Sequence, residues 1–195
     1  MARDRKARPE ARPLRLFVAV DVPESVRETL ARRVAPLHMS VPGGRWVVPE
    51  NWHLTLKFLG SVYPRLRDWV GEQVAATART AERFETRLTA LGAFPSARRA
   101  RVLWVGLDDS EGRFKSLADE LDRLLEREFD VEKRPFTAHL TVARLRDQVA
   151  LDDDAMSIDV GSEPFTVDAL TLYRSHLQRP AARYEPLARF GLGAS

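Results

Sequence analysis

The strings His53-Leu54-Thr55-Leu56 and His139-Leu140-Thr141-Val142 decide the fold of this chain of 195 residues. Each string reads histidine, apolar residue, threonine, apolar residue, and each lies in a run of strand-forming residues. Alternate side chains of a strand point to opposite faces, so each strand would present an imidazole and a hydroxyl on one face. Two such strands would supply two imidazoles, which is the minimum for paired acid–base chemistry near neutral pH.

The same order of features occurs twice along the chain. The stretch 16–21 resembles 103–108 at an offset of 87 positions, and the two motif histidines are 86 positions apart. The shared offset predicts a duplicated strand–helix–strand unit, whose pseudo-two-fold axis would bring both histidines to one groove. We therefore expect a single bilobal domain over residues 14–195, built from halves at 14–100 and 101–190. A flexible basic arm over residues 1–13 would precede it.

Hydrophobic periodicity and chain-breaking residues predict the elements of both halves. Strands are expected at 14–20, 51–59, 84–91, 101–107, 135–145, 165–173 and 184–190. Helices are expected at 24–37, 66–83 and 111–129. The acidic run at 152–154 is expected to form a solvated loop rather than a set of metal ligands.

Composition and missing motifs narrow the class of protein. The chain has no cysteine, which excludes disulfides, thiolate nucleophiles and cysteine-based zinc sites. Signatures of metal-dependent proteases, nucleotide-binding loops and α/β-hydrolases are also absent, so we expect neither a metal nor a cofactor. No apolar run has the length of a membrane span and none follows the basic N-terminus, so we expect a cytoplasmic protein without a membrane partner.

Arginine supplies all but four of the 31 basic side chains, and the isoelectric point is about 9.6. Arginine favours bidentate contacts with phosphate. A genome rich in G and C would produce the same bias, so the balance permits a nucleic-acid substrate without requiring one.

Two imidazoles that face one another suit the cleavage of a phosphodiester. One imidazole would activate the attacking oxygen, and the other would protonate the leaving oxygen on the opposite side of phosphorus. Thr55 and Thr141 would donate hydrogen bonds to the non-bridging oxygens, where negative charge develops. The residues alone identify the pair but not which histidine is the acid.

With these motifs the chain resembles the 2H phosphoesterase superfamily. It is especially similar to the bacterial LigT-like RNA 2′,3′-cyclic phosphodiesterases, formerly called 2′-5′ RNA ligases. The resemblance covers nearly the whole chain from Arg15, and its matching stretches are 15–21, 46–47, 49–51, 53–60, 139–144, 172–175 and 182–185. Trp52 stands where a smaller aliphatic residue is usual, and Ala138 stands where proline is frequent. We expect both departures to change the shape of the groove rather than the activity.

The resemblance implies an α+β fold in which two antiparallel sheets surround a central groove, with helices outside. It also implies metal-free hydrolysis of RNA-terminal 2′,3′-cyclic phosphates to 2′-phosphates, and RNA ends such as those of tRNA fragments are the expected partners. In that reaction His53 would be the proton donor and His139 the proton acceptor. Some relatives also join RNA ends through a reversible 2′-5′ linkage, and this activity stays open here. We expect the chain to act as a monomer.

Three further side chains are candidates for binding the substrate. Arg144 has strand parity opposite to that of His139, so it would have to reach the phosphate from the end of the strand. Lys57 shares the parity of His53 and would border the groove. Phe17 would stack on a base, with packing in the core as the alternative.

Two other functions stay open from the sequence. The same chemistry would act on small cyclic phosphates of nucleotides or of ADP-ribose derivatives. A groove of this kind would also suit a module that binds RNA without hydrolysing it.

Overall fold

The computed structural model describes residues 12–41, 43–178 and 181–193, so the expected arm at 1–13 lies outside the described residues except for its last two. The strands are β1 (Leu14–Asp21), β2 (Gly44–Trp46), β3 (His53–Val62), β4 (Phe84–Thr86), β5 (Leu88–Phe94), β6 (Ala100–Leu107), β7 (His139–Val149), β8 (Phe165–Val167), β9 (Ala169–His176) and β10 (Arg183–Gly191). The α-helices are α1 (Glu24–Val34), α2 (Leu37–Ser40), α3 (Arg67–Thr80), α4 (Arg113–Leu125) and α5 (Asp153–Met156).

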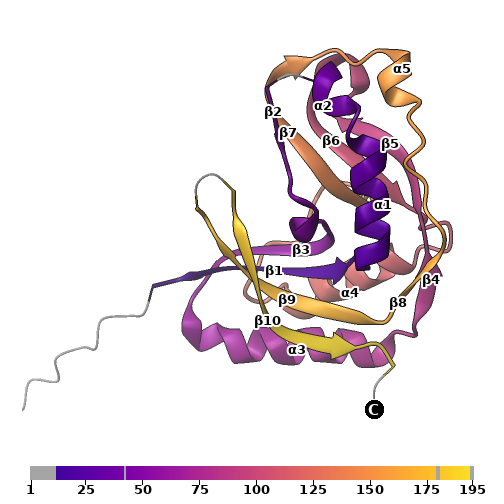
Figure 1. Ribbon diagram of the computed structural model, residues 1–195. Helices are drawn as coiled ribbons and strands as arrows, with labels where there is room; N and C mark the ends of the chain where they lie inside the picture. The colour runs from indigo at the N-terminus through magenta and orange to yellow at the C-terminus, as the bar shows by residue number, and fades with distance from the viewer. Residues whose placement is uncertain (1–11, 42, 179–180, 194–195) are drawn as a thin grey trace, which may run out of the picture.

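Antiparallel pairing joins the strands in the order β10-β9-β1-β3-β7-β6-β5, and β2 is added to β7. One residue pair, Leu54 opposite Leu140, connects β3 with β7. This pair divides the sheet into a lower arm (β10, β9, β1, β3) and an upper arm (β2, β7, β6, β5), which stand at a steep angle to one another (Figure 1). The α+β fold expected from the resemblance is confirmed, with its two sheets joined at this single pair.

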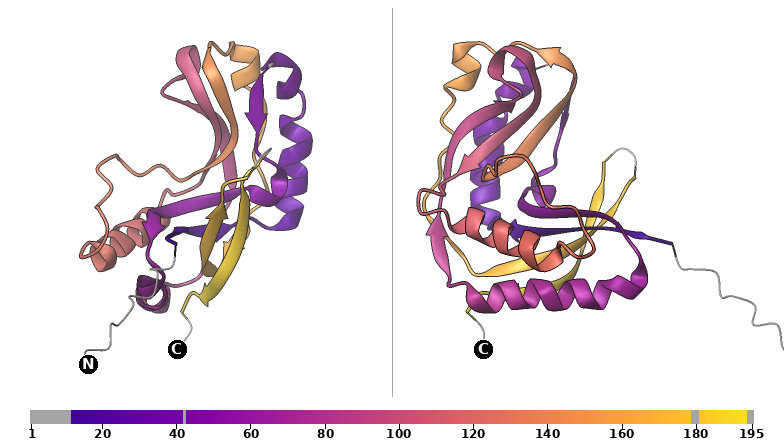
Figure 2. Two further views of the ribbon diagram at one scale, coloured as in Figure 1. Left: turned by 90° about the vertical axis from the view of Figure 1, so that its left-hand side faces the viewer. Right: turned by 180° about the vertical axis from the view of Figure 1, so that it is seen from behind.

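Each arm takes elements from both expected halves. β9 from the second half pairs with β1, and β2 from the first half pairs with β7. α1 follows β1 in the chain but runs along the upper arm, whereas α4 follows β6 and packs against β3 of the lower arm, beside α3 (Figures 1 and 2). The two halves therefore exchange elements, although their division near residue 100 stays a prediction.

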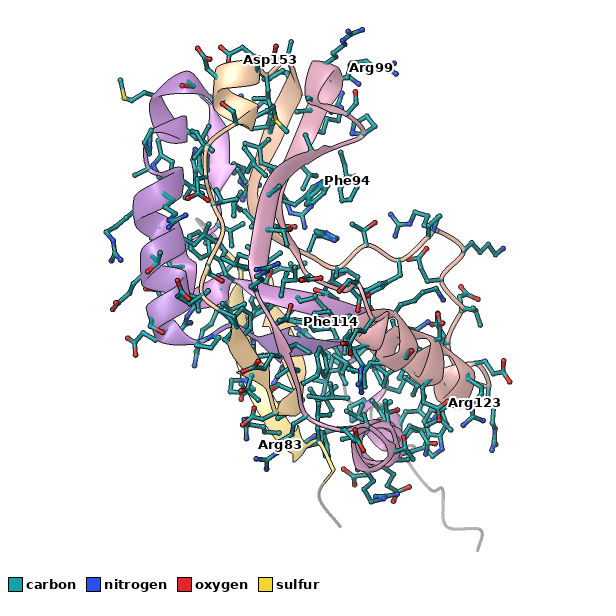
Figure 3. All side chains as sticks on the ribbon, turned by 90° about the vertical axis from the view of Figure 1, so that its right-hand side faces the viewer. Arg83, Phe94, Arg99, Phe114, Arg123 and Asp153 are labelled. Atoms are coloured by element: carbon teal, nitrogen blue, oxygen red, sulfur yellow. The ribbon has the colours of Figure 1, made fainter. Side chains whose placement is uncertain are left out.

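The helices cover one face of each arm with apolar side chains. α4 places Phe114, Leu117, Leu121 and Leu125 at helical spacing on its buried side, as its sequence periodicity predicts. α1 begins directly after Pro23, whose fixed φ suits a helix start, and it buries Val26, Leu30 and Val34. We call the opposite, helix-free face of each arm its inner face. Figure 3 shows Phe94 on the inner face of the upper arm, on the side away from α1.

Several expectations differ from the structure. The acidic run forms the start of α5, because the Asp152 carboxylate caps the helix by accepting a hydrogen bond from the Ala155 amide (2.8 Å). The strands expected at 84–91 and 165–173 are each interrupted, and their first segments, β4 and β8, form a separate small sheet. Trp52 and Ala138 are 4% and 8% exposed and lie in the apolar core, so they do not line the groove, and their expected effect on its shape stays a prediction.

Candidate functional site

The Leu54–Leu140 pair places both motifs on one face of the sheet. Both leucines are completely buried, and directly opposed residues of an antiparallel ladder point to the same face. The motif residues on either side of the two leucines therefore share the inner face. The four residues brought together are His53, Thr55, His139 and Thr141.

The two imidazoles are held in the same way. Nδ1 of His53 lies 2.8 Å from the carbonyl oxygen of Asn51, and Nδ1 of His139 lies 2.7 Å from the carbonyl oxygen of Thr137. A carbonyl only accepts hydrogen bonds, so each Nδ1 carries the proton of the neutral ring. Nε2 is then the nitrogen that exchanges a proton: it accepts one when the ring is neutral and donates one when the ring is charged.

Aromatic rings fix the position of His53. The Phe17 ring stacks on the imidazole with a centroid distance of 4.8 Å, and the Tyr184 ring meets it edge-on at 5.1 Å. Phe17 is only 3% exposed and also stacks on Tyr173. The expectation that Phe17 stacks on a base is therefore wrong, because the histidine and the tyrosines cover its ring.

A second pair of rings packs against His139. Phe94 meets the imidazole edge-on at 5.2 Å, and Trp104 does so at 5.8 Å. Gly92 is paired with Trp104, and a Cβ at this position would lie 2.2 Å from the indole ring. The glycine thus allows the indole to lie over the neighbouring strand and reach the histidine.

A β-bulge in β3 reverses the direction of the residues that follow it. Ala19 pairs with Thr55 but Val18 pairs with Lys57, so Leu56 is an extra residue on β3. Lys57 is consequently 5% exposed and faces α4, where it forms an ion pair with Asp122. The prediction that Lys57 borders the groove is wrong.

Phe58 takes the place that the alternation assigned to Lys57. Its side chain is 67% exposed, and its ring lies 6.1 Å from that of Phe17, among the aromatic residues that surround His53. An exposed phenyl ring on this face is suited to stacking on a base.

The same bulge recurs in β7. Leu103 pairs with Ala143 but Trp104 pairs with Thr141, so Val142 is the extra residue there. Arg144 is therefore exposed on the inner face, and the parity that the sequence predicted for it is wrong. Its positive charge lowers the pKa of both motif histidines, as the smallest of the causes in each case.

The pKa values of the two histidines are lowered for related reasons. Burial is the largest cause for His53 and lowers its pKa to about 4, against the opposing effects of the Asn51 carbonyl and the Asp21 carboxylate. Burial also lowers the pKa of His139, and the Thr137 carbonyl opposes it. Both rings are therefore neutral in the free protein at neutral pH.

One carboxylate breaks the symmetry of the site. Asp21 lies directly opposite His53 in the β1–β3 ladder and raises the pKa of that ring. Its counterpart Asp108 instead accepts a hydrogen bond from the Ser110 amide and faces Arg87 at 3.6 Å. Within the described part of the chain, no carboxylate is a cause of the pKa shift of His139.

Side chains of β9 hold Asp21 in place. Thr171 donates a hydrogen bond to Asp21 Oδ2 (2.8 Å), and Tyr173 donates one to Oδ1 (2.6 Å). Burial and the bond to Asp21 raise the pKa of Tyr173, which keeps its hydroxyl a donor. Sequence reasoning missed Asp21, Tyr173 and Tyr184, although the matching stretches 15–21, 172–175 and 182–185 contain them.

Asn51 connects the first motif to the β9–β10 connection. Its side-chain amide donates a hydrogen bond to the Ala182 carbonyl (2.8 Å), while its own carbonyl holds His53. The position of the imidazole therefore depends on the segment that leads into β10, which also carries Tyr184.

The described residues contain neither a cluster of metal ligands nor a membrane-spanning helix. No group of three or more His, Asp or Glu side chains is arranged to hold a metal ion within ranges 12–41, 43–178 and 181–193. No helix within these ranges combines the length and hydrophobicity required to cross a bilayer.

Comparisons with known proteins agree with this geometry. The family model described as LigT like Phosphoesterase matches the chain twice, at residues 20–104 and 105–184. The chain is 32% identical to an RNA 2′,3′-cyclic phosphodiesterase of Methanothermobacter thermautotrophicus over 92% of its length and 99% of that relative. It is 29% identical to one of Geobacillus stearothermophilus, of which it spans 56% of the length.

A solved structure shares the whole fold. The structure of Escherichia coli LigT complexed with 3′-AMP superposes with a TM-score of 0.77 at 30% identity, covering 93% of this chain and 99% of that one.

Proposed function

Since this chain belongs to the family of LigT-like phosphoesterases, we propose that it hydrolyses RNA-terminal 2′,3′-cyclic phosphates to 2′-phosphates. One observation carries the proposal. His53 and His139 lie on a shared inner face, each with Nδ1 held by a carbonyl and Nε2 left to exchange a proton. Paired imidazoles in this state are suited to general acid–base cleavage of a phosphodiester.

The reaction proceeds in one displacement at phosphorus. Nε2 of His139 accepts a proton from water while the water oxygen bonds to phosphorus. The bond from phosphorus to the 3′-oxygen breaks, and protonated Nε2 of His53 supplies the proton that this oxygen needs. The product carries the phosphate on the 2′-oxygen, and the two histidines have exchanged protonation states.

Asp21 favours the protonated form of His53, the proposed acid, although burial outweighs it and keeps the pKa of the ring at about 4 in the free protein. A carboxylate beside an imidazole stabilises the charged form, and only the first motif has such a neighbour among the described residues. The substrate phosphate brings a further negative charge, which raises the pKa of a nearby imidazole above that in the free protein.

The remaining inner-face residues bind the phosphate and the nucleotide. The Thr55 and Thr141 hydroxyls donate hydrogen bonds to the non-bridging oxygens, and Arg144 neutralises the charge that grows on them in the transition state. Phe58 replaces Phe17 as the ring that stacks on a base, because it is the exposed member of the aromatic group.

Both motifs lie in one chain, so a monomer contains the whole site. We propose that it acts as a monomer in the cytoplasm on RNA ends such as those of tRNA fragments, without a metal or a cofactor. Reversible 2′-5′ ligation would use the same two histidines, with the 5′-hydroxyl of a second RNA in place of water as the attacking group. Small cyclic phosphates are the second candidate substrates, because a relative of this fold has been solved with 3′-AMP.

The test is the hydrolysis of an RNA oligomer that ends in a 2′,3′-cyclic phosphate, followed by phosphorus NMR of the product. We expect a 2′-phosphate, the same rate in EDTA, and a loss of at least 100-fold in His53→Ala and His139→Ala, consistent with the usual contribution of a general acid or base. A 3′-phosphate, or near-normal rates in either variant, would contradict the proposal. Turnover of cyclic mononucleotides only would favour the small-molecule alternative.

A further inference from the structure

We propose that the inner face of the upper arm binds the RNA chain on the 5′ side of its cyclic end, along a row of four arginines. This inference rests on the proposed function. We call the four side chains the arginine row: Arg45, Arg144, Arg146 and Arg99.

The pairing of β2 with β7 places two members side by side. Arg45 lies directly opposite Arg144, so both point to the same face of the upper arm. The next pair, Trp46 and Ala143, points to the other face: Ala143 is completely buried, and the Trp46 ring lies 4.1 Å from that of His38 in α2. Because α2 covers the helix side, Arg45 and Arg144 lie on the inner face.

Arg146 extends the row along β7. Leu145 between the two arginines is 8% exposed, whereas both arginines are exposed, as strand alternation requires. Residues two apart on a strand are separated by roughly 6.8 Å, so Arg146 is a step further from His139. Arg99 projects at the far end of the upper arm on the same side as Phe94 (Figure 3).

Three members of the row have no carboxylate partner among the described residues. Arg99, Arg144 and Arg146 form no ion pair with a carboxylate of any described residue, whereas several surface arginines elsewhere do so. Examples of such pairs are Arg33–Asp159, Arg123–Glu120, Arg134–Glu132 and Arg189–Asp168. A line of like charges that starts at the catalytic pair is complementary to a polyanion whose end is being cut.

The chemistry of the substrate fixes the direction of the chain. A 2′,3′-cyclic phosphate closes the 3′ end of an RNA, so every other phosphate lies on its 5′ side. With the cyclic phosphate between His53 and His139, the preceding phosphates have to leave the site along one arm. The arginine row begins at the catalytic pair and runs away from it, so we assign the phosphates of the preceding nucleotides to this row.

The experiment compares Arg146→Gln with the unmodified protein on two substrates. These are cyclic 2′,3′-CMP and a single-stranded hexamer with a 2′,3′-cyclic end. We expect kcat/KM to fall about tenfold for the hexamer and to stay within about twofold for cyclic CMP. The slope of log kcat/KM against log salt should be smaller by about one for the hexamer, since one phosphate contact is lost. Arg79→Gln, in the last turn of α3, is the matched control and should change neither substrate.

Equal losses on both substrates, or no loss on the hexamer, would overturn the arginine row. Binding is measured separately by fluorescence anisotropy, with a labelled hexamer that carries a 3′-phosphate and is not a substrate. If the protein hydrolyses neither cyclic substrate, the proposed function fails, while weaker hexamer binding by Arg146→Gln would still support the row. If hydrolysis proceeds and Arg146→Gln binds the hexamer as tightly as the unmodified protein, the row alone fails.

Discussion

His53 and His139 present the same ring nitrogen to one inner face, because each donates its Nδ1 proton to the carbonyl oxygen two residues earlier. Their surroundings differ in one charge. His53 has the Asp21 carboxylate opposite it in the ladder, and His139 has no such neighbour among the described residues. The two histidines therefore have the same orientation but different charged neighbours. Such a difference is needed if two copies of one motif are to act as an acid and as a base.

Stability should depend on pH through His53. Its pKa in the folded protein is about 4, against about 6.5 unfolded, so the unfolded chain binds more protons between these values. The contribution of the neutral His53 ring to the free energy of unfolding is complete above pH 6.5 and is lost as the pH falls towards 4. From pH 7.5 to pH 5 we expect His53 to account for a loss of about 2 kcal/mol in the free energy of unfolding.

Urea unfolding of the unmodified protein, His53→Gln and the exposed control His38→Gln measures this contribution. Between pH 7.5 and pH 5, the free energy of unfolding should fall by about 2 kcal/mol less in His53→Gln than in the unmodified protein. In His38→Gln it should fall as much as in the unmodified protein. An identical fall in all three proteins would contradict the environment described for His53.

Asp21→Asn should lower the pKa of His53 further, because the carboxylate raises it. The acid is then protonated in a smaller fraction of molecules, and kcat/KM at pH 7 should fall by the same factor, tenfold for each pKa unit. Histidine NMR titration and initial rates measure the two quantities. Asp108→Asn, at the corresponding position of the second half, should change neither. Similar effects of the two substitutions would show that the site has no such asymmetry.

Arg144→Gln should raise the pKa of both motif histidines, since its charge lowers both. Activity should nevertheless fall about 100- to 1000-fold on a cyclic mononucleotide, because a charge that stabilises the transition state is lost. NMR titration combined with kcat/KM separates the two effects. Unchanged pKa values would mean that the guanidinium does not reach the two rings.

Lys57→Met should destabilise the fold by about 3–5 kcal/mol, because it leaves the Asp122 carboxylate without its buried partner. Lys57 also donates a hydrogen bond to the Asp130 carbonyl, in the segment that leads to the second motif. The double variant Lys57→Met/Asp122→Leu should recover most of the loss in urea unfolding at pH 7. A double variant as unstable as the single one would contradict an ion pair between the two side chains.

The strands, the helices and the two catalytic candidates follow from the sequence, because period-two and helical patterns are strong in these segments. The sequence does not predict which face of the sheet the residues after each motif point to. One extra residue in a strand turns every side chain after it to the opposite face. The sequence nevertheless contains a signal for the two bulges. The apolar spacing of Leu54, Leu56 and Leu59 changes from two to three, and the change recurs 86 positions later at 140, 142 and 145.

Contacts between distant segments are the other part that local patterns do not contain. Tyr173 and Tyr184 reach His53 only because β9 pairs with β1 and β10 pairs with β9. The burial of Phe17 follows from the same pairing. These relationships depend on which strands become neighbours, and periodicity within one strand carries no information about that.

The division of labour between the two histidines is tested most directly with a substrate whose 3′-bridging oxygen is replaced by sulfur. A thiolate leaves without a proton, so a variant that lacks only the general acid regains its rate on this substrate, whereas one that lacks the base does not. We predict that His53→Ala hydrolyses the sulfur substrate at close to the rate of the unmodified protein while His139→Ala remains inactive. Recovery of His139→Ala, or equal inactivity of both variants, would contradict the account.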